Sequence, residues 1–84
     1  MAKLNKLIEQ ILLGRSDANI GFDELRNVLL GLGFSERTRG SHHIFSHPGV
    51  EELINLQRDG SKAKPYQVRQ IRAIILRYRL GAKE

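Results

Sequence analysis

Two stretches in the N-terminal half of the chain have apolar residues three and four positions apart, the period of one helix face. The first set is Leu4, Leu7, Ile8, Ile11 and Leu12. The second set is Phe22, Leu25, Val28, Leu29 and Leu32. Glycines follow both stretches, at positions 14 and 33, and glycine often ends a helix. The pattern therefore predicts a helix over residues 4–13, a polar connection, and a second helix over residues 22–32.

The middle of the chain has a pattern typical of strands. Residues 34–39 alternate weakly, and residues 42–47 are rich in β-branched and aromatic side chains. The turn residues Gly40-Ser41 separate them, so the two segments predict a β-hairpin. After a second turn at Pro48-Gly49 we expect a third strand over about residues 52–57, with a short helix as the alternative.

A final helix is predicted from Pro65, because proline is favoured at the first helical position, where its missing N–H has no helical partner anyway. We expect the helix to end at Gly81. Its apolar stripe is Val68, Ile71, Ile74, Ile75 and Tyr78. The predicted order of helix, helix, three strands and helix indicates an α+β two-layer domain, with the helices on one face of a small antiparallel sheet.

The 84 residues suffice for one domain with a modest core, so we expect a single domain over residues 1–84. The chain contains no cysteine, which excludes disulfides, cysteine zinc sites and thiol nucleophiles. No apolar run approaches the roughly 18 residues of a membrane span, and the N-terminus lacks the apolar block of a signal peptide. We therefore expect a cytoplasmic protein with no membrane partner.

The positive charge is concentrated in the second half of the chain. The net charge is +5, and residues 35–79 contain nine basic and four acidic side chains, whereas the first 34 residues are balanced. Clustered lysine and arginine indicate a polyanionic partner. Two alternatives stay open, a solvated basic surface and a basic face that binds an acidic protein.

All three histidines fall within six residues, at positions 42, 43 and 47. Alternate side chains of a strand point to opposite faces, and we assign Ile44 to the core because the helices must cover one side. This assignment places His43, Phe45 and His47 on the open face of the sheet. An exposed Phe45 between two histidines predicts a platform on which RNA bases stack.

Three interpretations of the histidines remain. They can be ordinary surface or hydrogen-bonded strand residues. A metal site at His43 and His47 is a weaker interpretation, because no cysteine and no nearby carboxylate in this run completes a ligand set. Acid–base chemistry is the sharpest interpretation, since histidine accepts and donates a proton near neutral pH.

The segment Lys62-Ala63-Lys64-Pro65 lies directly before the final helix. Lysines there oppose the helix dipole, while the N–H groups of a helix start attract phosphate, so the pair predicts a phosphate clamp. A flexible charged loop is the alternative. The final helix also contains Arg69, Arg72 and Arg79 without an acidic residue to pair with them, which favours an external anion or an acidic protein.

The run Gly40-Ser41-His42-His43-Ile44-Phe45, then a short strand, then Lys62-Ala63-Lys64-Pro65 opening a helix, resembles the HicA toxins of bacterial toxin–antitoxin systems. The resemblance extends from about Phe22 to Leu80. It implies a double-stranded-RNA-binding-like fold, helix–strand–strand–strand–helix, so that residues 1–20 are an N-terminal helical extension. The third strand departs from the family's Val-x-Val-Pro pattern, because Leu53-Ile54-Asn55-Leu56-Gln57 stands in its place.

The resemblance also implies a function. HicA toxins are small mRNA interferases, so we expect an endoribonuclease that cleaves single-stranded mRNA, needs no cofactor or metal and is neutralised by a cognate HicB-like antitoxin. The second histidine of the family motif Gly-Ser-x-His is catalytic, and it falls on His43. A non-catalytic RNA-binding module of the same fold is the alternative. The residues expected to contact RNA are Arg37, Arg39, Ser41, His42, Phe45, His47, Lys62, Lys64 and Arg69.

Overall fold

The computed structural model describes the backbone of residues 2–80 and the side chains of residues 6–80. In this part of the chain, three α-helices, a short 3₁₀-helix and five strands follow one another. They are α1 (Ala2–Leu13), η1 (Asp17–Asn19), α2 (Phe22–Gly31), β1 (Ser35–Arg39), β2 (His42–His47), β3 (Val50–Leu56), β4 (Arg58–Asp59), β5 (Lys62–Ala63) and α3 (Pro65–Tyr78). No described helix is both long and apolar enough to cross a membrane.

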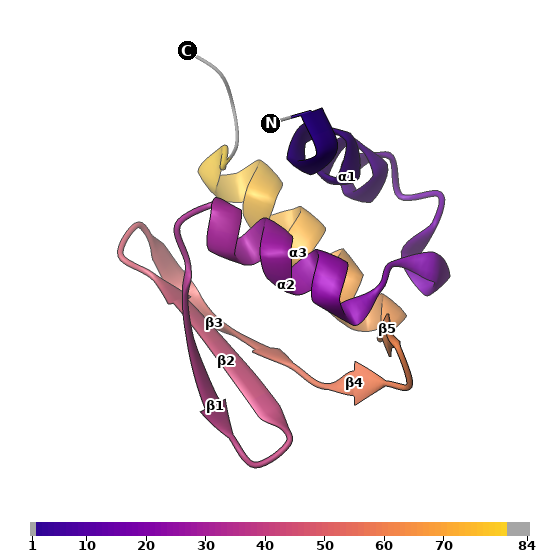
Figure 1. Ribbon diagram of the computed structural model, residues 1–84. Helices are drawn as coiled ribbons and strands as arrows, with labels where there is room; N and C mark the ends of the chain where they lie inside the picture. The colour runs from indigo at the N-terminus through magenta and orange to yellow at the C-terminus, as the bar shows by residue number, and fades with distance from the viewer. Residues whose placement is uncertain (1, 81–84) are drawn as a thin grey trace.

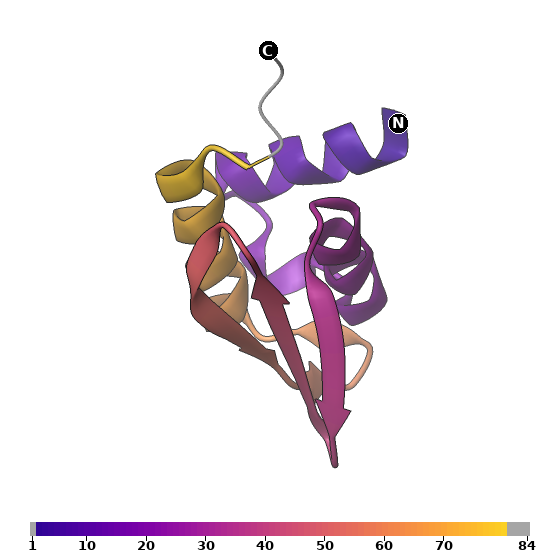
Figure 2. The same ribbon diagram turned by 90° about the vertical axis from the view of Figure 1, so that its left-hand side faces the viewer.

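Strands β1, β2 and β3 form an antiparallel sheet in that order, and α2 and α3 cover one of its faces (Figure 1). Helix α1 packs on α2 and α3 from the side away from the sheet. Figure 2, turned by 90°, shows the hairpin of β1 and β2 extending beyond the helix layer. The predicted α+β order is confirmed, with α1 as the additional N-terminal helix, and the third segment is a strand rather than a short helix.

The predicted helix ends depend on glycine. Gly33 has a φ of +99°, a conformation that residues with a Cβ rarely adopt, and it stops α2 as expected. Gly14, with a φ of +71°, ends α1 in the same way. Helix α3 already ends at Tyr78, where Arg79 adopts the left-handed conformation. The predicted helix end at Gly81 and the place of the Leu4 side chain in the first stripe lie outside the described residues.

The predicted assignment of the two faces of β2 is wrong. Phe45 has no exposed surface and packs in the core between the sheet and the helices, whereas Ile44 points to the open face. Because side chains alternate along a strand, His43 and His47 share the inner face with Phe45. Two adjacent apolar residues must point to opposite faces, and the larger ring of Phe45 fills the space under the helices.

Two further contacts were not expected from the sequence pattern. After β3 the chain forms a second, two-stranded hairpin, β4–β5, which a single bridge between Gly21 and Lys62 joins to the start of α2. The guanidinium of Arg72 pairs with both carboxylate oxygens of Asp17, at 2.9 and 3.1 Å, and donates to the Ile11 carbonyl at 3.1 Å. The charge of Arg72 is therefore balanced within the chain, which corrects the expectation that this arginine awaits an external anion.

Candidate functional site

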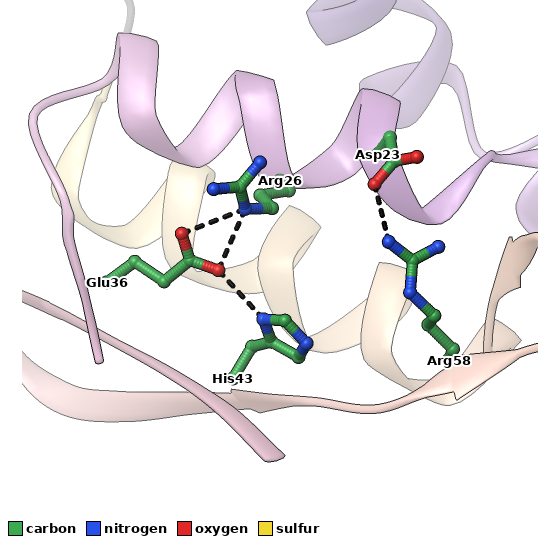
Figure 3. Close-up of polar contacts among 5 residues, drawn as sticks. All are labelled: Asp23, Arg26, Glu36, His43 and Arg58. Atoms are coloured by element: carbon green, nitrogen blue, oxygen red, sulfur yellow. Dashed lines mark hydrogen bonds and ion pairs between the residues drawn. The ribbon is translucent and has the colours of Figure 1, made fainter. Parts of the chain in front are cut away.

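His43 lies on β2 where the hairpin reaches the margin of the helix layer. Its ring packs in a T-shaped contact with the ring of Phe22, the first residue of α2, with the ring centroids 4.9 Å apart and the planes at 67°. Its Nδ1 lies 2.8 Å from Oε2 of Glu36 (Figure 3). The side chain is 21% exposed, so the imidazole is held on two sides and still reaches solvent.

Glu36 is the carboxylate that orients this histidine. It lies on β1 opposite Phe45, so it shares the inner face of the sheet with His43, and only 12% of its side chain is exposed. Arg26 of α2 directs its Nε to both carboxylate oxygens, at 2.8 Å each. The hydrogen bond from Arg26 is the main reason that the pKa of Glu36 lies below its usual value, and the hydrogen bond with His43 adds to this. Glu36 is therefore an ionised acceptor.

An ionised acceptor fixes the tautomer of a neutral imidazole. Because the Glu36 carboxylate has no proton to give, Nδ1 of His43 must carry the hydrogen, and the lone pair is on Nε2. Nε2 has no hydrogen-bond partner among residues 6–80, and none of the described side-chain nitrogens or oxygens is both buried and unpartnered, so Nε2 is not fully buried. The arrangement is that of a general base whose orientation a carboxylate fixes.

A second charged pair, Arg58 and Asp23, contacts the same Phe22 ring through its guanidinium. In Figure 3, Nε2 of His43 points away from Glu36, toward the side of the site on which Arg58 and Asp23 lie. The guanidinium carbon of Arg58 is 4.3 Å from the centroid of the Phe22 ring. Its Nη2 donates to Oδ1 of Asp23 at 2.8 Å. Phe22 therefore contacts both the imidazole and this guanidinium.

The other two histidines lie apart from His43 and have different surroundings. Nδ1 of His47 accepts the Gly49 N–H at 2.9 Å, and its ring contacts Phe34 at a centroid distance of 5.0 Å. It holds the turn between β2 and β3 at the far end of the strand. His42 is exposed on the open face, 3.2 Å from the side-chain oxygen of Asn55. Only one of the three histidines is therefore part of the carboxylate-oriented arrangement.

Phe45 is not a stacking platform. With none of its surface exposed, the ring offers no face to a base, and the prediction of an exposed aromatic at this position is wrong. Its companions on the predicted open face, His43 and His47, also lie on the helix side. A ligand of His43 would therefore have to approach from the margin of the helix layer, not across the open face of the sheet.

The remaining predicted RNA contacts fall into two groups. Arg37 and Arg39 line a shallow hollow on the open face together with Ile44 and Leu53. Lys62 belongs to β5, and Lys64 is the residue that precedes α3, so both adjoin the β4–β5 hairpin. The Phe22 N–H donates to the Ser61 carbonyl of this hairpin at 2.9 Å, which brings the hairpin next to the start of α2. The predicted contacts exposed to solvent are Arg37, Arg39, Ser41, His42, Lys62 and Arg69.

Four residues of the site are absent from the sequence prediction: Phe22, Arg26, Glu36 and Arg58. Glu36 contacts His43 across the hairpin and Arg26 contacts Glu36 from α2, whereas Arg58 reaches Phe22 from a segment that is distant along the chain. One signal for Glu36 was available in the sequence. Thr38 pairs with His43 across the hairpin, and Glu36 lies two positions before Thr38, so its carboxylate is on the same face of the sheet as His43. No three histidine, aspartate or glutamate side chains of residues 6–80 gather in a way that could hold a metal ion.

A comparison with protein families gives one match. The family model described as HicA toxin of bacterial toxin-antitoxin matches residues 22–77. The match begins at the first residue of α2 and ends one residue before the end of α3, so it contains every residue of the His43 site and leaves out α1. Neither the curated proteins nor the solved structures give a match.

Proposed function

The chain belongs to the HicA toxin family of bacterial toxin–antitoxin systems, and from this premise we propose that it acts by cleaving mRNA in the cytoplasm, with His43 as general base. A cognate HicB-like antitoxin would neutralise it. The observation that supports this proposal is the His43–Glu36 contact at 2.8 Å, which leaves Nε2 unpartnered among residues 6–80 and its lone pair available. A carboxylate-held imidazole of this kind is suited to proton transfer and is more than a surface histidine needs.

The proposed reaction moves protons and one bond at phosphorus. Nε2 of His43 accepts the proton of a ribose 2′-hydroxyl, and the 2′-oxygen bonds to the adjacent phosphorus. The bond from phosphorus to the 5′-oxygen breaks, and the leaving oxygen takes a proton from water. The imidazolium then returns its proton to the hydroxide so formed. The products are a 2′,3′-cyclic phosphate and a 5′-hydroxyl, and no external reactant is consumed.

Glu36 serves this reaction without touching RNA. It keeps the proton of the resting imidazole on Nδ1 and stabilises the imidazolium that forms when Nε2 is protonated. Arg26 in turn holds the carboxylate in place with two hydrogen bonds. We assign Glu36 and Arg26 as positioning residues and His43 as the catalytic residue.

We propose that basic residues on the two sides of the site bind the RNA. Lys62 and Lys64 belong to the segment next to the start of α2, and Arg69 follows one turn further along α3. Arg37, Arg39, Ser41 and His42 extend along the hairpin of β1 and β2. A single strand that crosses the hairpin margin would contact both groups, and phosphate contacts of this kind do not depend on sequence.

The test compares wild type with His43→Ala and His42→Ala on a long single-stranded RNA, with a DNA of the same sequence beside it. We expect His43→Ala to abolish cleavage and His42→Ala to have a smaller effect, because only His43 is oriented by a carboxylate. DNA should remain intact since it has no 2′-hydroxyl, and cleavage should continue in excess EDTA.

Two outcomes decide against the proposal. Equal cleavage by wild type and His43→Ala would refute the role of His43. Binding of RNA without cleavage by the folded wild type would favour a non-catalytic RNA-binding module.

A further inference from the structure

We infer that Arg58 is a second catalytic residue, whose guanidinium, held over the Phe22 ring, binds the phosphate that is cleaved. The inference rests on the proposed function and adds to it the group that balances negative charge at phosphorus. Proton transfer by His43 alone leaves that charge without a partner. A cation beside the reacting phosphate is the usual means of stabilising it.

The position of Arg58 follows from two contacts with one ring. Phe22 is fully buried as a residue, yet its ring has the imidazole of His43 at 4.9 Å and the guanidinium carbon of Arg58 at 4.3 Å, both measured to the Phe22 centroid. The imidazole and the guanidinium therefore lie no farther apart than these two distances together. A phosphodiester that presents its 2′-hydroxyl to Nε2 of His43 would place its phosphate oxygens toward Arg58.

The guanidinium has capacity for such a ligand. Its side chain is 48% exposed, and it makes one hydrogen bond, to Asp23, which is itself 68% exposed. Among residues 6–80, the other N–H groups of Arg58 have no partner. A single exposed pair contributes little to stability, so a phosphate can replace or share the carboxylate at little cost. Two parallel N–H groups of arginine also match two phosphate oxygens.

The other arginine at the site, Arg26, is already committed. It directs Nε to both oxygens of Glu36, on the side of the imidazole opposite Nε2 (Figure 3). The contact with Phe22 and the ion pair with Asp23 hold the Arg58 guanidinium beside the site, the first through the attraction between a cation and the face of an aromatic ring. A preorganised cation stabilises a transition state better than a mobile one.

The experiment measures single-turnover cleavage of a long single-stranded RNA by wild type and Arg58→Gln, with enzyme in excess. We expect the rate of Arg58→Gln to fall by about 10²–10³-fold, the effect of losing one preorganised donor to the developing charge. Arg58→Lys, which keeps the charge and loses the paired donors, should fall between the two. Affinity for a 2′-O-methyl RNA, which lacks the nucleophile, should weaken by less than about tenfold because one phosphate contact is lost.

Arg77 provides a matched control. It is 66% exposed, pairs with Glu52 through one contact of 3.1 Å, and lies 5.4 Å from the centroid of the Tyr78 ring, so Arg77→Gln makes the same chemical change at the other end of the molecule. Its cleavage rate should equal that of wild type. Asp23→Asn removes the ion pair and keeps Arg58, and it should cleave at least as fast as wild type.

The outcomes separate this inference from the proposed function. If wild type cleaves, His43→Ala does not, and Arg58→Gln cleaves within threefold of wild type, the role of Arg58 is refuted and that of His43 stands. If Asp23→Asn reproduces the loss seen in Arg58→Gln, the arginine acts only by pairing with Asp23, and the inference also fails. If wild type does not cleave RNA at all, the proposed function fails first.

Discussion

Replacing Glu36 with glutamine tests whether the carboxylate positions His43 for proton transfer. The change keeps the shape of the side chain and removes its charge. In wild type, Oε2 lies 2.8 Å from Nδ1, and both side chains are largely shielded from solvent. An amide in this place can donate its own N–H to Nδ1, which would move the ring proton to Nε2 and remove the base.

The size of the effect follows from the geometry. Two unit charges about 4 Å apart interact by about 4 kcal/mol at an effective dielectric constant of about 20. Arg26 pairs with the same carboxylate, so we take about 2 kcal/mol of this energy as the part left to stabilise the imidazolium, or about 30-fold in rate. The change of the imidazole to the wrong tautomer adds a second loss, so we expect Glu36→Gln to lower the cleavage rate by about 30-fold to 10³-fold.

The assay is single-turnover cleavage at saturating protein, together with the affinity for 2′-O-methyl RNA. A positioning role predicts a lower rate and unchanged affinity, and no further loss when Glu36→Gln is added to a His43→Ala background. Circular dichroism confirms that the variant is folded, because the lost hydrogen bonds are expected to cost only about 1–3 kcal/mol. A folded Glu36→Gln that cleaves within threefold of wild type would refute the reasoning.

Three other predictions concern the fold, its pH dependence and the binding surface. Phe45→Ala should cost about 3–5 kcal/mol of unfolding free energy and lower the Tm by at least about 12 °C, because the ring is fully buried; a shift of a few degrees would contradict the burial. The hydrogen bond from Arg26, with that of His43, holds the pKa of Glu36 below its usual value, so the ionised carboxylate stabilises the fold at neutral pH and this contribution is lost as pH falls through the lowered pKa. Urea unfolding should therefore show the difference between wild type and Glu36→Gln shrinking below about pH 4, and a difference that stays constant from pH 7 to pH 3 would argue against the pairing. Replacing Lys62 and Lys64 together by glutamine should reduce the slope of log affinity against log salt for single-stranded RNA by about 1.4, and an unchanged slope would show that neither lysine contacts phosphate.

The elements of the fold could be predicted because each has a local cause. Apolar spacing defined the helices, and glycines with positive φ at positions 14 and 33 ended two of them where expected. The hairpin followed from Gly40-Ser41 between two strand-like segments. Each of these signals depends only on residues that are a few positions apart, so it can be recognised in the sequence itself.

The faces of β2 and most of the site could not be predicted in this way. Ile44 and Phe45 are adjacent and both apolar, so alternation alone leaves two equal choices, and only the space beneath the helices decides between them. The pairing of Arg72 with Asp17 joins residues 55 positions apart, and that of Arg58 with Asp23 joins residues 35 apart. The motif identified His43, while the residues that orient it depend on tertiary contacts.

The order of the site along the chain has a consequence for synthesis on the ribosome. The ribosome adds three residues of the site within 18 consecutive positions, ahead of β3 and α3: Arg26, Glu36 and His43. The framework comes later: Phe45 shares its core with Ile54 and Ile71, and the Gln67 side chain joins α3 to β3 through the Asn55 carbonyl at 3.3 Å. At 5–20 residues per second, the ribosome needs about two to eight seconds to add the 41 residues of positions 44–84. During that interval the three side chains have been made but lack the scaffold that holds them in register, so on the proposed function the nascent chain becomes active only once α3 has been added.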